Sequence, residues 1–329
     1  MKADRPSEAT LRKVFCEIAQ GYTPVTVGEK DAVIRHLKQR DQYDLECHRE
    51  EIYNKAKASG LPTEEEALEV LIEGEVWSRK EENEIGDMKK YVENLEDTKK
   101  NLIIPSQIEN INKDIEEGRQ KLNDLSAKRK SLLAETCESY AAKKNNDYSI
   151  YLCLYQPQDH NLRFFTWDEF CEMPKVTLGE LFTEYVKATQ HLNPENIKYL
   201  SISSVFALYY NILGGKNLHK LFDCPAYELS FYQLNLLNFA KILHSILENV
   251  EGIPSEIKKE PDDLLAYAES KRKNKNIVEK SKGKQGFSVM GATKKDMDEM
   301  GVSDELAVSP FELAKNKGSL TLEDFQNFS

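Results

Sequence analysis

Apolar residues recur every three or four positions along most of the chain, which is the period of an α-helix. The first such pattern follows Ser7, a favourable N-cap residue, and predicts a helix that stops at Gly21. Residues 22–27 favour an extended or β-like stretch instead. Two more helices are expected, one over residues 31–37 and one from about 41 to 59.

Another helix start lies in the next stretch of the chain. Thr63 followed by Glu66 has the spacing of a capping box, in which the two side chains bind each other's backbone N–H groups. An apolar face follows at helical spacing. We therefore expect residues 1–79 to form an N-terminal helical unit.

The clearest pattern lies in residues 80–137, where apolar positions alternate between spacings of three and four, as in a heptad repeat. Pro105 interrupts the pattern, and proline is strongly disfavoured inside a helix. Two helices of similar length around a Pro105-Ser106 break predict an antiparallel hairpin that closes on itself as a coiled coil. The alternative is one long kinked helix packed on other subunits. The predicted seam consists of Ile85, Met88, Val92, Leu95, Leu102, Ile108, Ile111, Ile115, Leu122, Leu125 and Leu132.

Residues 138–270 are rich in aromatic side chains and are expected to form a helical domain with the main core. Residues 148–155 are apolar enough for either a buried helix or a strand. Asn193 followed by Pro194 predicts a helix start, and that helix should run to about Leu213. Further helices are expected over 230–250 and from Pro261 onward. An aromatic stripe of Phe206, Tyr209 and Tyr210, together with the pair Phe231-Tyr232, could line a binding site, but aromatic residues at helical spacing are more often part of a core.

Residues 271–329 differ in character, because tyrosine and tryptophan are absent and the amphipathic pieces are too short to be stable alone. We expect a flexible tail that becomes ordered against a partner. The competing interpretation is that the tail folds back onto its own core. The expected partner-binding anchors are Phe287, Met290, Met297, Met300, Phe311, Leu313, Phe325 and Phe328.

The balance of charges argues against a chain that coats nucleic acid, since the net charge is −11. Residues 271–284 are basic although the whole chain is acidic, because they contain seven basic residues and one acid. Phosphate or nucleic-acid contact is one interpretation of this run, and a solvated linker or a strip that meets an acidic partner is the other. The second is favoured because no aromatic side chains interleave with the basic ones.

Patterns of catalytic chemistry are missing. The six cysteines are all at least 16 residues apart, and the histidines form no HxxxH or HExxH pair. Glycine-rich phosphate loops are also missing, so we expect a non-enzymatic protein with no catalytic residue, metal or cofactor. The sequence has no run of about 18 apolar residues, so no membrane segment is expected.

Several stretches together resemble structural and assembly proteins of large contractile-tailed bacteriophages, in particular tail assembly chaperones and baseplate hub components. The likeness rests on Arg5-Pro6-Ser7-Glu8-Ala9-Thr10-Leu11, Gly21-Tyr22-Thr23-Pro24-Val25-Thr26, Gly60-Leu61-Pro62-Thr63 before Trp77, the heptad region, Leu221-Phe222-Asp223-Cys224-Pro225, Phe231-Tyr232-Gln233-Leu234, Ile253-Pro254-Ser255-Glu256-Ile257, and Glu260-Pro261-Asp262-Asp263-Leu264-Leu265 before the basic tail.

This resemblance implies a scaffold of phage tail or baseplate assembly, either built into the virion or acting as a chaperone in the host cytoplasm. Its partners would be other tail or baseplate proteins or further copies of the chain. A nucleic-acid-associated adaptor that uses residues 271–284 is the alternative. A degenerate enzyme, with a site assembled from dispersed residues that spacing rules do not reveal, is a third option. The expected fold is mostly α, with a helical core, a protruding coiled-coil hairpin at 80–137 and an extended tail at 271–329.

Overall fold

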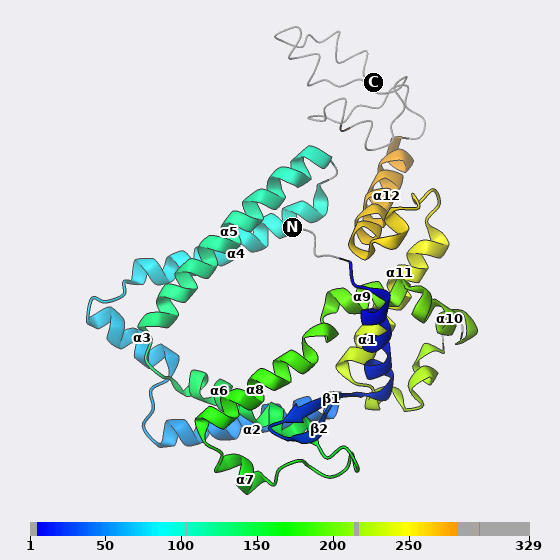
Figure 1. Ribbon diagram of the computed structural model, residues 1–329. Coiled ribbons are helices and arrows are strands. Elements are labelled where there is room, and N and C mark those ends of the chain that lie inside the picture. Colours follow the sequence, from blue (N-terminus) through cyan, green and yellow to red (C-terminus); the bar gives the residue numbers. More distant parts are fainter. Residues whose placement is uncertain (1–4, 103, 214–216, 282–295, 297–329) are drawn as a thin grey trace, which may run out of the picture. The chain divides into compact units, whose positions relative to one another are not determined.

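The computed structural model describes residues 5–102, 104–213, 217–281 and 296, and it is mostly helical, as the sequence predicts (Figure 1). The chain divides into two compact units. The first consists of residues 1–64 and 135–265, and the second of residues 65–134 and 266–329.

The first unit begins with α1 (Glu8–Gln20), which is capped at both ends by local residues. The Ser7 hydroxyl accepts a hydrogen bond from the Thr10 N–H at 3.1 Å. Gly21 ends the helix with φ 80°, a left-handed conformation that glycine adopts without steric cost.

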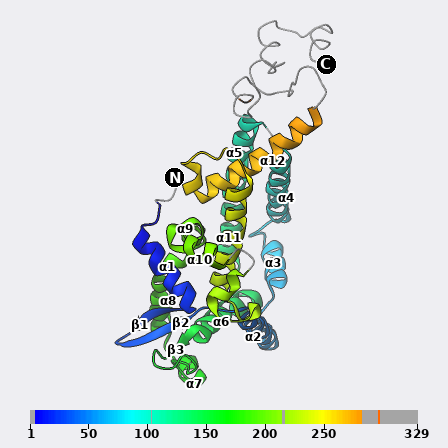
Figure 2. The same ribbon diagram turned by 90° about the vertical axis from the view of Figure 1, so that its right-hand side faces the viewer.

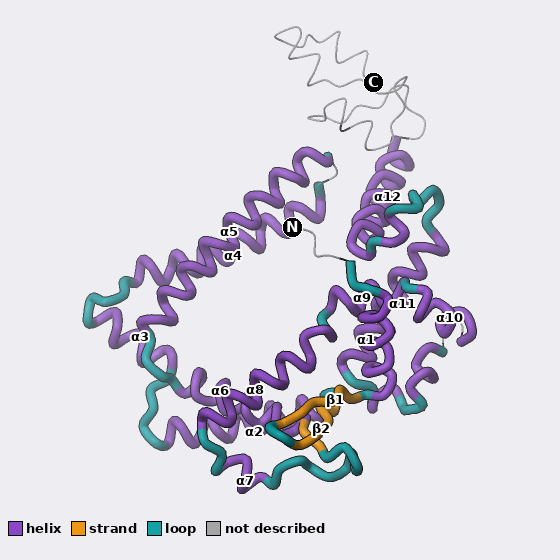
Figure 3. The backbone as a smooth tube through the Cα atoms, in the orientation of Figure 1, coloured by secondary structure: helices purple, strands orange, loops and turns teal. Residues whose placement is uncertain are grey.

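A small antiparallel sheet follows, with the strand order β1 (Tyr22–Val27), β2 (Lys30–Arg35) and β3 (Leu154–Tyr155) (Figure 3). The helix expected over residues 31–37 is therefore wrong. Gly28, with φ 61°, lies in the two-residue connection that folds β2 back onto β1. Val33 and Ile34 are β-branched and buried, which suits a strand that is paired on both sides.

Two long helices of this unit, α2 (Gln39–Ala58) and α6 (Cys137–Cys153), pack against each other. The two alternatives for residues 148–155 are both realised, because α6 ends at Cys153 and β3 starts at Leu154. After β3 come α7 (Trp167–Cys171) and α8 (Lys175–Thr189), the second of which packs on β1.

The rest of the unit is a group of helices in which α9 packs on α1 and α11 (Figure 2). The helix expected from Pro194 to Leu213 is broken at Ser203, which has extended backbone and donates its N–H and hydroxyl to the Leu200 carbonyl. The elements are α9 (Pro194–Ile202), α10 (Ser204–Leu213), α11 (Phe231–Asn249), the start of α12 (Pro261–Ser281), and 3₁₀ turns at Gln190–Leu192, Leu218–Phe222, Ala226–Glu228 and Ile257–Lys259.

Two hydrophobic clusters stabilise the first unit. One joins α1, α9, α10 and α11, and its fully buried side chains include Ile18, Leu200 and Phe206. The other joins the sheet to α6, α7 and α8 around Ile34 and Leu154. Of the predicted aromatic stripe, Phe206 and Tyr210 lie in the core, but 37% of Tyr209 is exposed.

The second unit contains α3 (Glu64–Glu73), which starts at the last residue of the first unit, followed by α4 (Arg79–Asn101) and α5 (Pro105–Leu132). Helices α4 and α5 pack against each other, and Trp77, just before α4, is 1% exposed. Its indole N–H donates to Glu82, and the Lys128 ammonium of α5 lies 5.3 Å from its ring centroid.

The start of the predicted tail is helical, because α12 continues to Ser281. The last helix, which was expected from Pro261 onward, therefore continues through residues 271–281 of the predicted tail. Pro261 and the acidic pair Asp262-Asp263 favour this helix start, and lysine, arginine and alanine are good helix formers farther along.

Candidate partner-binding surfaces

Helix α10 carries apolar side chains on two sides, and only one of these sides is buried in the core. Phe206 and Tyr210 point inward and are 0% and 8% exposed. On the opposite side Leu208 and Ile212 are 60% and 71% exposed, although they lie four residues apart on one face. Leu208, Tyr209 and Ile212, together with Val205, which is half-buried against the core, form what we call the α10 face.

Ring contacts hold α10 in place from the inside. The Phe15 ring of α1 lies 4.9 Å from the Tyr209 ring and 6.2 Å from the Phe206 ring, measured between centroids. The Tyr210 ring stacks on His244 of α11 at 3.7 Å, and the His244 Nε2 atom is 2.9 Å from the Ser201 carbonyl oxygen. The α10 face is therefore presented by a firmly packed helix.

A second exposed apolar stripe follows one flank of α8. It consists of Val176, Phe182 and Val186, which are 74%, 50% and 44% exposed. The opposite side of the helix packs into the second hydrophobic cluster through Leu181 and Tyr185, and burial raises the pKa of the Tyr185 phenol well above its usual range. Both exposed surfaces belong to the first unit.

The predicted hairpin seam can be compared with the structure residue by residue. Every seam residue is buried or half-buried, and the most buried are Val92, Ile111 and Ile115, at 6–7% exposure. Most of the positions between them are exposed. Supercoiling of the two helices stays a prediction.

Ion pairs join α4 to α5, and each of those described here links an acid of α4 to a base of α5. Glu81 and Glu82 near the start of α4 pair with Lys128 and Arg129 near the end of α5, at 2.7 and 2.8 Å. The third pair is Glu96 with Arg119, at 2.6 Å. The early part of one helix thus meets the late part of the other, which makes the hairpin antiparallel.

Gly118 lets the two helices approach closely. A Cβ atom added there would lie 2.9 Å from the Val92 Cγ2 atom, which is closer than a carbon–carbon contact tolerates.

The predicted tail anchors Phe287, Met290, Met297, Met300, Phe311, Leu313, Phe325 and Phe328 lie outside the described residues.

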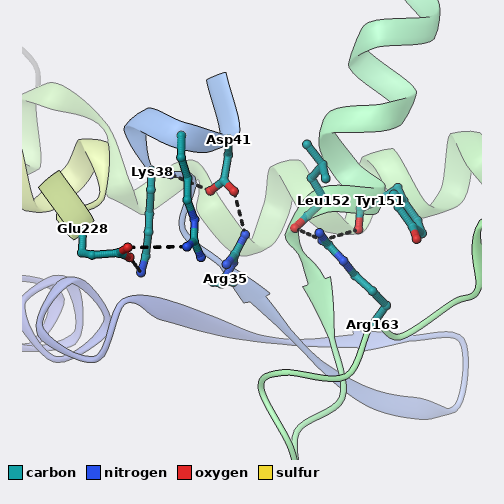
Figure 4. Close-up of polar contacts among 8 residues, drawn as sticks. Arg35, Lys38, Asp41, Tyr151, Leu152, Arg163 and Glu228 are labelled. Atoms are coloured by element: carbon teal, nitrogen blue, oxygen red, sulfur yellow. Dashed lines mark hydrogen bonds and ion pairs between the residues drawn. The ribbon is translucent and has the colours of Figure 1, made fainter. Parts of the chain in front are cut away.

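Charged side chains at the edge of the sheet form hydrogen bonds and ion pairs with other groups of the protein (Figure 4). Arg35 donates to Asp41 at 2.9 Å, and Lys38 donates to Glu228 at 2.8 Å and lowers the pKa of that carboxyl. Arg163 donates to the carbonyl oxygens of Tyr151 and Leu152 at the end of α6. A cation at a helix C-terminus is stabilising, so these contacts fix the loops around the sheet.

A chain of buried polar groups runs through the first unit. The Thr23 hydroxyl donates to Glu17 at 2.8 Å and lies 3.0 Å from His36 Nε2, while His191 Nε2 lies 2.8 Å from the same Glu17 carboxylate. Burial, with a contribution from nearby His191, lowers the pKa of His36 to about 4. His36 is therefore neutral at pH 7 and, because Thr23 donates to Glu17, its Nε2 atom carries the proton.

Sequence reasoning missed this polar chain, because its members are far apart and no spacing rule connects them. A cavity of about 250 Å³ adjoins it and is lined by His36, Lys38, His160, Cys224 and Glu228 among others. Within the described part of the chain, no cluster of three or more histidine, cysteine, aspartate or glutamate residues is arranged to hold a metal ion.

Comparisons with known proteins identify no relative: no protein family, no curated protein and no solved structure matches this chain. Among the described residues, no helix is long and apolar enough to cross a membrane.

Proposed function

We propose that this chain is a non-enzymatic structural or assembly protein of a contractile-tailed bacteriophage, and that it works by binding other tail or baseplate proteins. The α10 face is the observation that carries the protein-binding part of this proposal. The phage setting rests on the sequence resemblance alone.

The argument from α10 is energetic. Leaving Leu208 and Ile212 in water forgoes about 1.5–3 kcal/mol for each side chain that a partner could bury. A single exposed leucine is ordinary, but neighbouring apolar residues on one face of a helix are typical of protein-binding surfaces. The helix is also packed from below, so binding would not need to order it first.

The paired charges support a binding role over catalysis. Arg35, Lys38 and Arg163 are engaged by a carboxylate or by backbone carbonyls. The Cys153 thiol is buried, and burial raises its pKa to about 12, so it is not a nucleophile at neutral pH. These side chains stabilise the fold.

The test is to purify phage particles and tail-assembly intermediates from cells that make the tagged full-length chain, and to identify the bound proteins by mass spectrometry. We expect tail or baseplate proteins in stoichiometric amounts. The opposite outcome is a chain that binds DNA with an affinity that falls steeply with salt and binds no tail protein, which would favour the nucleic-acid adaptor.

A further inference from the structure

A carboxylate from the C-terminal region caps the start of α5. The Asp296 side chain accepts hydrogen bonds from the Ser106 backbone N–H at 2.9 Å and from the Ser106 hydroxyl at 3.0 Å. Asp296 is only 3% exposed. The two residues are 190 positions apart in the sequence and belong to the same compact unit.

Helix α5 lacks a cap of its own. Its N-cap residue is Ile104, which makes no side-chain cap bond, and its first turn contains no acidic residue. The first backbone N–H groups of a helix have no partner within the helix, and the helix dipole favours a negative charge beside them. The Asp296 carboxylate beside Ser106 therefore supplies both a hydrogen-bond acceptor for the N–H group and a negative charge for the helix dipole.

Helix α4, the other long helix of the hairpin, is capped by its own residues. At the start of α4 the Ser78 side chain accepts from the Glu81 N–H, and the Glu81 carboxylate accepts from the Ser78 N–H, so both caps are local. Among the described residues, the distant Asp296 supplies the equivalent group to α5. The capping of α5, unlike that of α4, thus depends on a residue that is far away in the sequence.

A buried carboxylate is costly unless hydrogen bonds compensate for its lost hydration. Asp296 is compensated at the α5 start. In the sequence, the predicted partner anchors Met290, Met297 and Met300 lie within six residues of it.

We propose that the first turn of α5 is the docking site of the chain's own C-terminal region, with Asp296 as its anchor. The contact is a latch between Asp296 and α5, and binding of a partner to the C-terminal region opens it. This release step rests on the proposed function, whereas the latch itself does not.

The latch is tested by hydrogen exchange on the full-length chain, comparing Asp296→Ala with wild type. Exchange at the Ser106 amide and its neighbours in the first turn of α5 should accelerate about 10-fold, which is the size of a typical N-cap loss. Asp298→Ala removes an equal charge two residues away and should leave these rates unchanged. Equal rates in wild type and Asp296→Ala would overturn the proposal.

Trypsin provides a second measurement, since Lys294 and Lys295 directly precede the anchor. Cleavage there should be about 10-fold faster in Asp296→Ala than in wild type or Asp298→Ala. Exchange in α11 of the first unit should not change, which separates release of the latch from unfolding. Faster exchange in α11 as well, with no selective gain at Ser106, would show a structural residue and refute the latch.

Release is measured by the amount of tail or baseplate protein bound to each variant. Asp296→Ala should bind at least as much as wild type, because no contact with α5 has to be broken first. A loss of binding with the exchange result intact would refute the release step while leaving the docking site standing. Absence of binding by every variant, wild type included, would count against the proposed function instead.

Discussion

The two units of this protein are stabilised in different ways. The first unit buries whole side chains in two clusters, and Leu200, Phe206 and Leu236 are each 0% exposed. In the second unit, Trp77 just before α4 is also fully buried, at 1% exposure, but the row of residues between α4 and α5 is less enclosed, and Val92, Ile111 and Ile115 in this row are 6–7% exposed. Two helices have one shared face, so a hairpin cannot surround a side chain as a core does.

The polar groups of the two units also differ in how deeply they are buried. In the first unit Glu17, Thr23 and His36 are buried and bonded to one another. In the hairpin the Arg119–Glu96 pair lies at the surface, with side chains 56% and 40% exposed, and the Arg129–Glu82 pair is half-buried, at 19% and 31%. Burial makes each polar contact of the first unit expensive to break, whereas the hairpin uses many weak contacts to set its register.

Truncation of a core side chain should have the largest effect. Phe206→Ala leaves a cavity in the first unit and should lower the free energy of unfolding by about 3–5 kcal/mol. Val92→Ala in the hairpin removes less volume from a site that solvent can reach, and should cost about 1–2 kcal/mol. Urea unfolding followed by hydrogen exchange in each unit measures both, and equal costs would contradict the contrast between the units.

The stability of the first unit should depend on His36. Its folded-state pKa of about 4 lies below the ordinary value of 6.5, so the unfolded chain takes up the proton first as the pH falls. Stability should therefore be greatest above pH 6.5 and decline towards pH 4, by about 3 kcal/mol in total.

His36→Gln tests this assignment, because the glutamine amide can still donate to Thr23 but does not titrate. Glu17 and His191, which also face this site, are retained in the variant, and so is Tyr232, whose ring packs 4.8 Å from His36. The difference between the two stability–pH curves then reports the titration of His36 together with its coupling to His191. Parallel curves for wild type and His36→Gln would show that another group is responsible.

Two glycines of the hairpin should respond in opposite directions to alanine. Gly118→Ala places a methyl group against Val92 and should destabilise the hairpin by about 1–3 kcal/mol. At Gly86 a Cβ atom meets nothing within 4 Å, so Gly86→Ala should stabilise the hairpin by about 0.5–1 kcal/mol through helix propensity. Thermal unfolding of both variants measures these changes in stability. Stabilisation by both substitutions would show that the helices do not approach closely.

The surface ion pairs should have the smallest effect. Arg119→Ala should cost about 0.2–1 kcal/mol, because both partners are solvated. The cost should shrink further as salt rises, since exposed charges are screened. An effect above 2 kcal/mol that persists in 1 M salt would contradict a surface role.

Local signals in the sequence predicted much of this fold. Ser7, Asn193 and Ser230 cap the helices that they were expected to start, because a cap is a contact between residues two or three positions apart. The hairpin pattern was equally readable, since α4 and α5 bury the predicted row of residues.

Features that depend on distant partners were not predictable in this way. Residues 31–37 have a pattern that a short helix could also use, and pairing with β1 and β3 decides for a strand. The polar chain joins Glu17 to His191 across 174 positions, and Asp296 reaches Ser106 across 190. Neither separation leaves a spacing that a single sequence can reveal.

The central claim is that the chain acts through the α10 face, and a charge-bearing double variant tests it most directly. Leu208→Glu with Ile212→Glu should leave the fold intact, because both side chains are mostly exposed. Tyr227→Glu is the matched control, since Tyr227 is 74% exposed but lies outside α10. The measurement is the amount of each variant bound to purified phage particles or tail intermediates. We predict a loss of at least about 10-fold for the double variant, equivalent to 1.4 kcal/mol, and none for Tyr227→Glu. Wild-type binding by the folded double variant would contradict the account.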